Sequence, residues 1–274
     1  MKSRRGATRT EVATVIFCTL VLSALAVLFL QNGRTQSRRL LCERTLQQVG
    51  MGVRQYLDDQ RLYPLGTAGS RKLPAEKRWS WIVTVSEGIF PEGRAIPHPT
   101  KGWDEAELGR AMRVKGKMIQ LEGVPYDIES RLICPEMSIE VRDLKPARTT
   151  YVGLAGIGEG IEVMPLTQPR IGVFGYDRQL SPQQIPDGFK STLMVLETRE
   201  KLGPWLAGGK STVRGVIEAP GPYIGRDSQF GGLHLGGGYG VFADGRVQFL
   251  DEGVDPQVFL TFISINDTLK AKGP

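Results

Sequence analysis

Two histidines are the first residues in this 274-residue chain that could do chemistry. His98 lies between two prolines, which predicts an exposed loop position. His234 lies ten positions before Asp244-Gly245, and a histidine with a carboxylate could act as a catalytic pair or as part of a metal site. A metal site would need further ligands, such as Asp227, Asp251 or Glu252. The interpretation we favour is structural, with His234 bracing a hairpin through a buried hydrogen bond.

The three cysteines have different surroundings in the sequence. Cys18 lies inside an uncharged apolar run, where we expect it to act as a small unreactive apolar side chain. Cys42 and Cys134 lie outside that run. If the domain is exported, they are candidates for one disulfide; two separate buried thiols are the alternative.

The familiar catalytic patterns are missing from the sequence. No H-E-x-x-H, C-x-x-C, G-x-S-x-G or phosphate-loop pattern occurs. We therefore expect a protein that is not an enzyme and that needs neither a cofactor nor a metal.

The net charge of +6 is concentrated at the start of the chain. Residues 1–44 carry eight basic and two acidic side chains, and the remaining residues carry 27 of each sign. A nucleic-acid-binding domain would need its basic patch on the folded part. We expect no nucleic-acid partner, because the positive charge brackets an apolar segment and indicates membrane anchoring instead.

That apolar segment runs from Val12 to Leu30 without a charged residue. At about 1.5 Å per residue, a helix of this length crosses roughly one hydrocarbon core. A cleaved signal peptide is the alternative, because Ala24-Leu25-Ala26 resembles a cleavage site. We favour a retained anchor because the apolar run continues past that site.

A second helical pattern follows the membrane segment. Apolar residues spaced four, three, four and three apart predict one buried face of a helix, at Cys42, Leu46, Val49, Val53 and Tyr56. Gly50 and Gly52 weaken such a helix, so packing must support it. Asn32-Gly33 is a place where we expect a break or kink.

The rest of the chain alternates short apolar runs with turn signals, which predicts an antiparallel, loop-rich β domain. The predicted strands are 80–85, 118–121, 138–141, 150–154, 171–174, 191–197 and a hairpin over 239–250. Asp244-Gly245 supplies the hairpin turn. The predicted fold class is α+β: a long N-terminal helix, membrane-spanning in its first half, followed by an antiparallel, loop-rich β domain.

The residues before the apolar run resemble a type IV prepilin signal. A short basic leader ends at Gly6, and Glu11 is the fifth residue after it. The resemblance implies cleavage between Gly6 and Ala7, methylation of the new N-terminus, and a pairing of Glu11 with a neighbouring subunit's amine. The chain departs from the family pattern at Ala7, where the family usually has Phe or Met, and at Arg9 and Thr10, where it has apolar residues. A pairing of Arg9 with Glu11 in the same chain is the alternative to the intersubunit pairing.

Several short elements in order resemble the DUF1559 family, whose members join a prepilin-type start to a C-terminal H-x9-D-G motif. The elements include Cys42 with the following helix, Trp79-Ser80-Trp81, Cys134-Pro135, the run 187–193, and His234 with Asp244-Gly245. The resemblance covers residues 4 to about 250. It implies the architecture 1–6 leader, 7–31 transmembrane helix, 32–64 helix continuation and 65–274 extracytoplasmic β-rich domain.

From these patterns we expect a pseudopilin-like, non-catalytic structural or surface protein of a type IV pilus or type II secretion-like system. It would be a single-pass protein of the inner (cytoplasmic) membrane with its C-terminal domain in the periplasm or at the cell surface. The expected partners are the membrane, a prepilin peptidase and other pilin-like subunits. The alternative is a membrane-tethered ligand- or glycan-binding module that uses Trp79, Trp81, Trp103 and Trp205, although for these four side chains we favour core packing.

Overall fold

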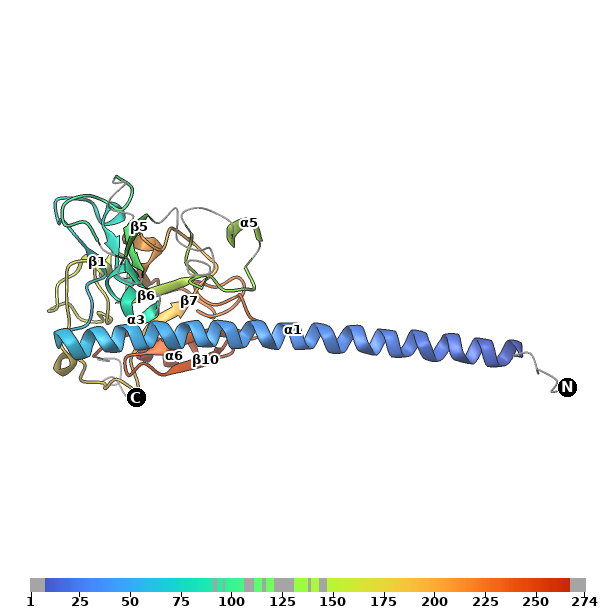
Figure 1. Ribbon diagram of the computed structural model, residues 1–274. Coiled ribbons are helices and arrows are strands. Elements are labelled where there is room, and N and C mark those ends of the chain that lie inside the picture. The colour runs from blue at the N-terminus through green and yellow to red at the C-terminus, as the bar shows by residue number, and fades with distance from the viewer. Residues whose placement is uncertain are drawn as a thin grey trace, which may run out of the picture. The chain divides into compact units, whose positions relative to one another are not determined.

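The computed structural model describes residues 8–90, 93–95, 97–105, 111–114, 117–120, 131–137, 139–142 and 147–266. It divides into two compact units, Met1–Leu40 and Leu41–Pro274, which are described separately. Helix α1 (Arg9–Gln60) begins in the first unit and ends in the second (Figure 1).

The first unit is the apolar half of α1. It begins with a capping box: the Glu11 carboxylate accepts from the Thr8 N–H at 2.8 Å, and the Thr8 hydroxyl accepts from the Glu11 N–H at 3.3 Å. Thr14, Thr19 and Ser23 return their hydroxyls to carbonyl groups of the preceding turn. Each of these three hydroxyl groups therefore has a hydrogen-bond acceptor within the helix, which lowers the cost of placing it in an apolar environment.

The expected break at residues 32–33 does not occur, because α1 is continuous from Arg9 to Gln60. A glycine lowers helix stability by about 1 kcal/mol relative to alanine, which is too little to end a helix that continues on both sides. The helix ends instead after Gln60, where Arg61 has a left-handed φ of 58° and its N–H donates to the Leu57 carbonyl.

In the second unit, the predicted apolar face of α1 is buried. Cys42, Leu46, Val49 and Val53 are each at most 1 % exposed. The glycines on this face allow close approach: a Cβ on Gly50 would lie 2.7 Å from the Gly245 carbonyl oxygen. The residue that weakens the helix in isolation is thus required by its packing.

The largest sheet has five strands in the order β10-β9-β7-β6-β8. They are β6 (Tyr151–Ile157), β7 (Leu193–Glu197), β8 (Val213–Val216), β9 (Gly237–Phe242) and β10 (Val247–Asp251). All neighbours pair antiparallel except β6 and β8, which are parallel.

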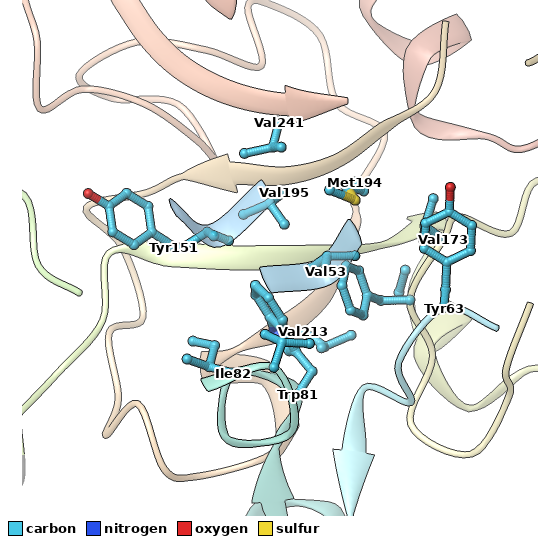
Figure 2. Packing of buried hydrophobic residues seen from close by; sticks show 14 of the residues in the cluster. Val53, Tyr63, Trp81, Ile82, Tyr151, Val173, Met194, Val195, Val213 and Val241 are labelled. Carbon is cyan, nitrogen blue, oxygen red and sulfur yellow. The ribbon is translucent and has the colours of Figure 1, made fainter. Parts of the chain in front are cut away.

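Helices cover both faces of this sheet. Tyr151, Val195 and Val241 share one core with Leu46, Val49 and Val53 of α1, as Figure 2 shows for the residues around Val53. Val152, Leu196 and Phe242, their neighbours in the chain, share a second core with α6 (Pro256–Ile263). Successive strand residues point to opposite faces, so the central strands are buried on both sides.

Smaller elements complete the second unit. The two-stranded sheet pairs β1 (Thr67–Ala68) with β2 (Trp79–Ser80), and the three-stranded sheet joins β3 (Gly93–Ala95), β4 (Ala111–Val114) and β5 (Lys117–Gln120). The short helices are α2 (Trp81–Thr84), α3 (Ser86–Ile89) and α5 (Ile139–Arg142).

Several expected strands are wrong. Residues 81–84 of the predicted strand 80–85 form α2. Residues 139–141 of the predicted strand 138–141 belong to α5, and Ser138 lies outside the described residues. Residues 171–174 contribute one isolated bridge, Gly156–Ile171. Runs this short have no period that separates strand from helix, so tertiary packing decides them.

The sequence prediction also missed several elements, among them the short elements β1, β3, β4 and α3, and two that pack on or belong to the largest sheet. Strand β8 is four residues long. Helix α6 spans eight residues. Asp255-Pro256 is a recognisable start signal: Asp255 caps the helix by accepting from the N–H groups of Gln257 and Val258, and Pro256 occupies the first turn.

Candidate functional site

The described part of the second unit gathers four chemically active side chains in one buried cluster: Cys42, Cys134, Glu197 and His234. Their sulfur, oxygen and nitrogen atoms lie within 4.8 Å of one another. They come from four separate segments, namely α1, the loop 131–137, the end of β7 and the turn before β9. We call these residues the Cys-Glu-His cluster.

The two cysteines of the cluster are joined as a disulfide, with their Cα atoms 5.6 Å apart. Cys42 is buried at the start of the packed face of α1, and Cys134 is buried in its loop. The loop is held by the Cys134 N–H, which donates to the Thr150 hydroxyl at 2.9 Å. The bond therefore ties the helix to the domain across 92 positions. Cys18 is a free, exposed cysteine of the first unit.

Glu197 is the member of the cluster that the sequence did not single out. It ends the buried strand β7 and is 0 % exposed. Its Oε2 accepts from the Tyr239 N–H at 2.7 Å, whereas its Oε1 has no hydrogen-bond donor among the described residues. A charged residue that closes an otherwise apolar strand, Leu193–Glu197, was the available signal.

His234 points into the same cluster. Its Nε2 lies 3.5 Å from the Cys134 sulfur and 3.5 Å from Glu197 Oε1. Its ring packs edge-on against Tyr239 at a centroid distance of 5.4 Å, and Nδ1 has no hydrogen-bond partner among the described residues. The imidazole thus reaches from the turn before β9 into the domain, where it faces sulfur and carboxylate; its bracing of the hairpin stays a prediction.

The negative charge of Glu197 reaches the neighbouring strand. Tyr151 lies opposite Glu197 in the register of β6 and β7. Burial, and secondarily the charge of Glu197, raises the pKa of the Tyr151 phenol well above its usual range. The phenol therefore stays neutral beside the cluster.

The Asp-Gly half of the H-x9-D-G motif lies elsewhere. Gly245 has a left-handed φ of 86°, and its N–H donates to the Phe242 carbonyl at 2.8 Å. Asp244 accepts from the Arg246 N–H at 3.0 Å, which closes the turn between β9 and β10. None of Asp227, Asp244, Asp251 and Glu252 belongs to the described Cys-Glu-His cluster. The motif therefore divides into a turn and a cluster residue.

The prepilin-type residues are only partly covered. Gly6 and Ala7 lie outside the described residues. Glu11 is in the capping box with Thr8 at the start of α1.

The tryptophans do not form an exposed platform. Trp79, Trp81 and Trp205 are at most 1 % exposed and belong to the core. Trp103 is half-buried, and its indole N–H donates to the Glu76 carbonyl at 2.8 Å. The hypothesis that these four side chains form a glycan-binding surface is wrong, because three of them are buried in the core.

A separate pocket of about 500 Å³ lies beside β8 and has mostly charged walls. Five cationic side chains and three acidic ones line it: Arg199, Lys201, Lys210, Arg214 and Arg226, with Glu162, Glu200 and Asp227. Burial lowers the pKa of Arg214 to about 10, and its Nε has no hydrogen-bond partner among the described residues. We call this the cationic pocket.

One of the comparisons with known proteins identifies a family. Residues 31–215, more than half of the chain, match the family model described as "Protein of unknown function (DUF1559)". No curated protein and no solved structure matches the chain. The matched stretch includes Cys42, Cys134 and Glu197 but ends before His234, and it begins after the prepilin-type residues. The chain belongs to the DUF1559 family.

Proposed function

We propose that this protein is a pseudopilin-like, non-catalytic surface component of a type IV pilus or type II secretion-like system. It is anchored in the cytoplasmic membrane by α1 and carries its second unit in the periplasm or at the cell surface. The carrying observation is one helix near the N-terminus, Arg9–Gln60, that is long and apolar enough to cross a membrane. Family membership and this helix are consistent with a membrane-anchored surface protein.

The start of α1 supports the processing step of the proposal. Glu11 Oε2 accepts from the N–H of Thr8, the residue after Ala7. After cleavage behind Gly6, the new amino group would belong to Ala7, one residue from that N–H. A carboxylate held there can pair with an amine of its own chain or of a neighbouring subunit, and either pairing offsets the cost of a charge at the membrane edge.

The test is fractionation followed by mass analysis of the intact protein. We expect detergent, and neither salt nor carbonate, to release the protein from membranes. We expect its mass to lack Met1–Gly6 and to include one methyl group. Gly6→Leu should block the cleavage, and Gly33→Leu is the matched control because a Cβ on Gly33 meets nothing within 4 Å.

Two results would contradict the proposal in different ways. An intact Met1 on the membrane-bound protein would leave a simple anchored surface protein. A soluble protein that begins near Val27 would establish the signal-peptide alternative.

The cationic pocket favours a second candidate, a membrane-tethered module that binds a small anion. The observation behind it is the excess of cationic over acidic side chains in this pocket, together with the buried Nε of one lining residue, Arg214, which has no hydrogen-bond partner among the described residues. In detergent, the full chain should be stabilised against heat by phosphate or glucuronate and not by glucose. Lys201→Gln with Arg226→Gln should remove that shift, whereas Arg246→Gln, which lies outside the pocket, should keep it. Equal shifts with glucose and glucuronate would end this candidate.

A further inference from the structure

The Cys-Glu-His cluster places a glutamate and a histidine beside its two cysteines, and a purely structural disulfide requires neither. Both cysteines, the glutamate and the histidine are buried, with their ligand atoms within 4.8 Å of one another. We propose that, while the two cysteines are thiols, these four side chains form a tetrahedral site for Zn²⁺ or a similar cation. The disulfide and the metal are then alternative ways of closing the same site.

The separations around His234 fit a tetrahedral ion. Its Nε2 lies 3.5 Å from Glu197 Oε1 and 3.5 Å from the Cys134 sulfur. Zinc bonds of about 2.0–2.2 Å to nitrogen or oxygen and about 2.3 Å to sulfur place neighbouring ligand atoms roughly 3.3–3.8 Å apart. His234 Nε2 therefore already has the spacing of a zinc site to the Glu197 oxygen and to the Cys134 sulfur, and the other ligand atoms, all within 4.8 Å of one another, need small shifts as the two sulfurs separate.

Glu197 supplies the strongest argument for a cation. A carboxylate that is 0 % exposed costs several kcal/mol unless it is compensated. One oxygen accepts a hydrogen bond from the Tyr239 N–H, and this bond fixes the orientation of the carboxylate. The other oxygen lies 3.5 Å from His234 Nε2, a contact that is an ion pair only when the imidazole is protonated, and it has no hydrogen-bond partner among the described residues. A disulfide offers that oxygen no positive charge, whereas a divalent ion does.

The choice between the two states needs no reductant, because a newly made chain carries thiols. Binding Zn²⁺ to Cys42 and Cys134 forms two metal–sulfur bonds and releases two thiol protons. Forming the disulfide passes two electrons and the two thiol protons to a thiol-disulfide oxidant, whose own S–S bond breaks to give two thiols. The metal would join four segments of the domain, whereas the disulfide joins two. Whichever reaction comes first sets the state, because the closed cluster is buried.

The test uses full-length protein in detergent with Cys18→Ser, which removes the exposed free thiol. The protein is unfolded, reduced with a phosphine, and refolded without oxygen in the presence of Co²⁺ as a spectroscopic probe. We expect one Co²⁺ per chain, the intense visible bands of a tetrahedral ion, a thiolate charge-transfer band, and loss of all of them when Zn²⁺ is added.

Glu197→Gln and Glu162→Gln are a matched pair, because both glutamates are buried and only Glu197 belongs to the cluster. Glu197→Gln should weaken Co²⁺ binding at least about tenfold, and Glu162→Gln should leave it within about twofold. Equal affinities for the two variants would overturn the four-ligand site.

A second measurement does not depend on any variant's folding. Zn²⁺ should raise the melting temperature of the reduced protein and leave that of the oxidised protein unchanged, because a ligand stabilises only the state that binds it. A reduced protein that folds without tetrahedral Co²⁺ bands, or a Zn²⁺ effect that is equal in both redox states, would overturn the proposal. Neither outcome bears on membrane anchoring or leader cleavage, so this proposal and the proposed function fail separately.

Discussion

The two halves of α1 share one secondary structure and treat apolar side chains in opposite ways. In the first unit, large apolar residues such as Phe17, Leu20 and Leu28 are more than half exposed. In the second unit, Leu46, Val49 and Val53 are at most 1 % exposed. An apolar side chain needs an apolar environment, which the second half obtains from the sheet and the first half must obtain from outside the chain. The helix is therefore continuous, but its two halves require different surroundings.

Shortening a leucine to alanine in each half tests whether only the second half is packed against protein. We expect Leu46→Ala to lower the free energy of unfolding of the domain by about 2–5 kcal/mol, because it removes buried methyl groups and leaves a cavity. Leu20→Ala should change it by less than about 0.5 kcal/mol. Denaturation of the full chain in detergent, followed by tryptophan fluorescence, measures both. Equal effects would show that the first half is also packed against protein.

The cysteines offer the same contrast. With Cys42→Ser and Cys134→Ser together, we expect the domain to lose about 2–4 kcal/mol under oxidising conditions, because the disulfide no longer restricts the unfolded chain. Cys18→Ser, in the exposed half of the helix, should cost almost nothing. Reductant should destabilise the parent protein and leave the double variant unchanged; a parent protein that is insensitive to reductant would contradict this expectation.

Two glycines, Gly245 in the domain and Gly33 in the exposed half of α1, differ in how much they should tolerate a side chain. Gly245→Val should destabilise the domain by about 1–3 kcal/mol, because a β-branched residue resists the left-handed φ of 86° at the hairpin turn. Gly33→Val lies in an open part of the helix, where a Cβ meets nothing within 4 Å, and should be neutral or slightly stabilising. Thermal melts of the two variants side by side give the difference, and a loss of stability in Gly33→Val would point to an undetected neighbour.

The smallest expected effect is at the start of the first half. Thr8→Ala removes the hydroxyl that accepts from the Glu11 N–H, so we expect the first turn of α1 to lose about 0.5–1 kcal/mol. Amide hydrogen exchange in micelles should become about two- to fivefold faster in that turn only. Thr35→Ala, whose hydroxyl returns to the Gln31 carbonyl inside the helix, is the control.

Local patterns in the chain were enough for the features that depend on neighbours in sequence. The uncharged run from Val12 to Leu30 predicts a helix that can cross a membrane, and the spacing from Cys42 to Val53 predicts its buried continuation. Asp244-Gly245 predicts the hairpin, whose register pairs Val241 with Val247. Each of these rests on a period or a turn signal within a few residues, which a sequence displays directly.

Other features were decided only by contacts between distant segments. The sequence left the pairing of Cys42 and Cys134 open, and it offered no reason to join Glu197 to His234. The parallel pairing of β6 with β8, the interior position of Trp81 and the helix at residues 81–84 also depend on what the sheet packs against. Burial by distant partners overrides weak local preference, because the free energy of packing a large side chain exceeds the small propensity differences between strand, helix and loop.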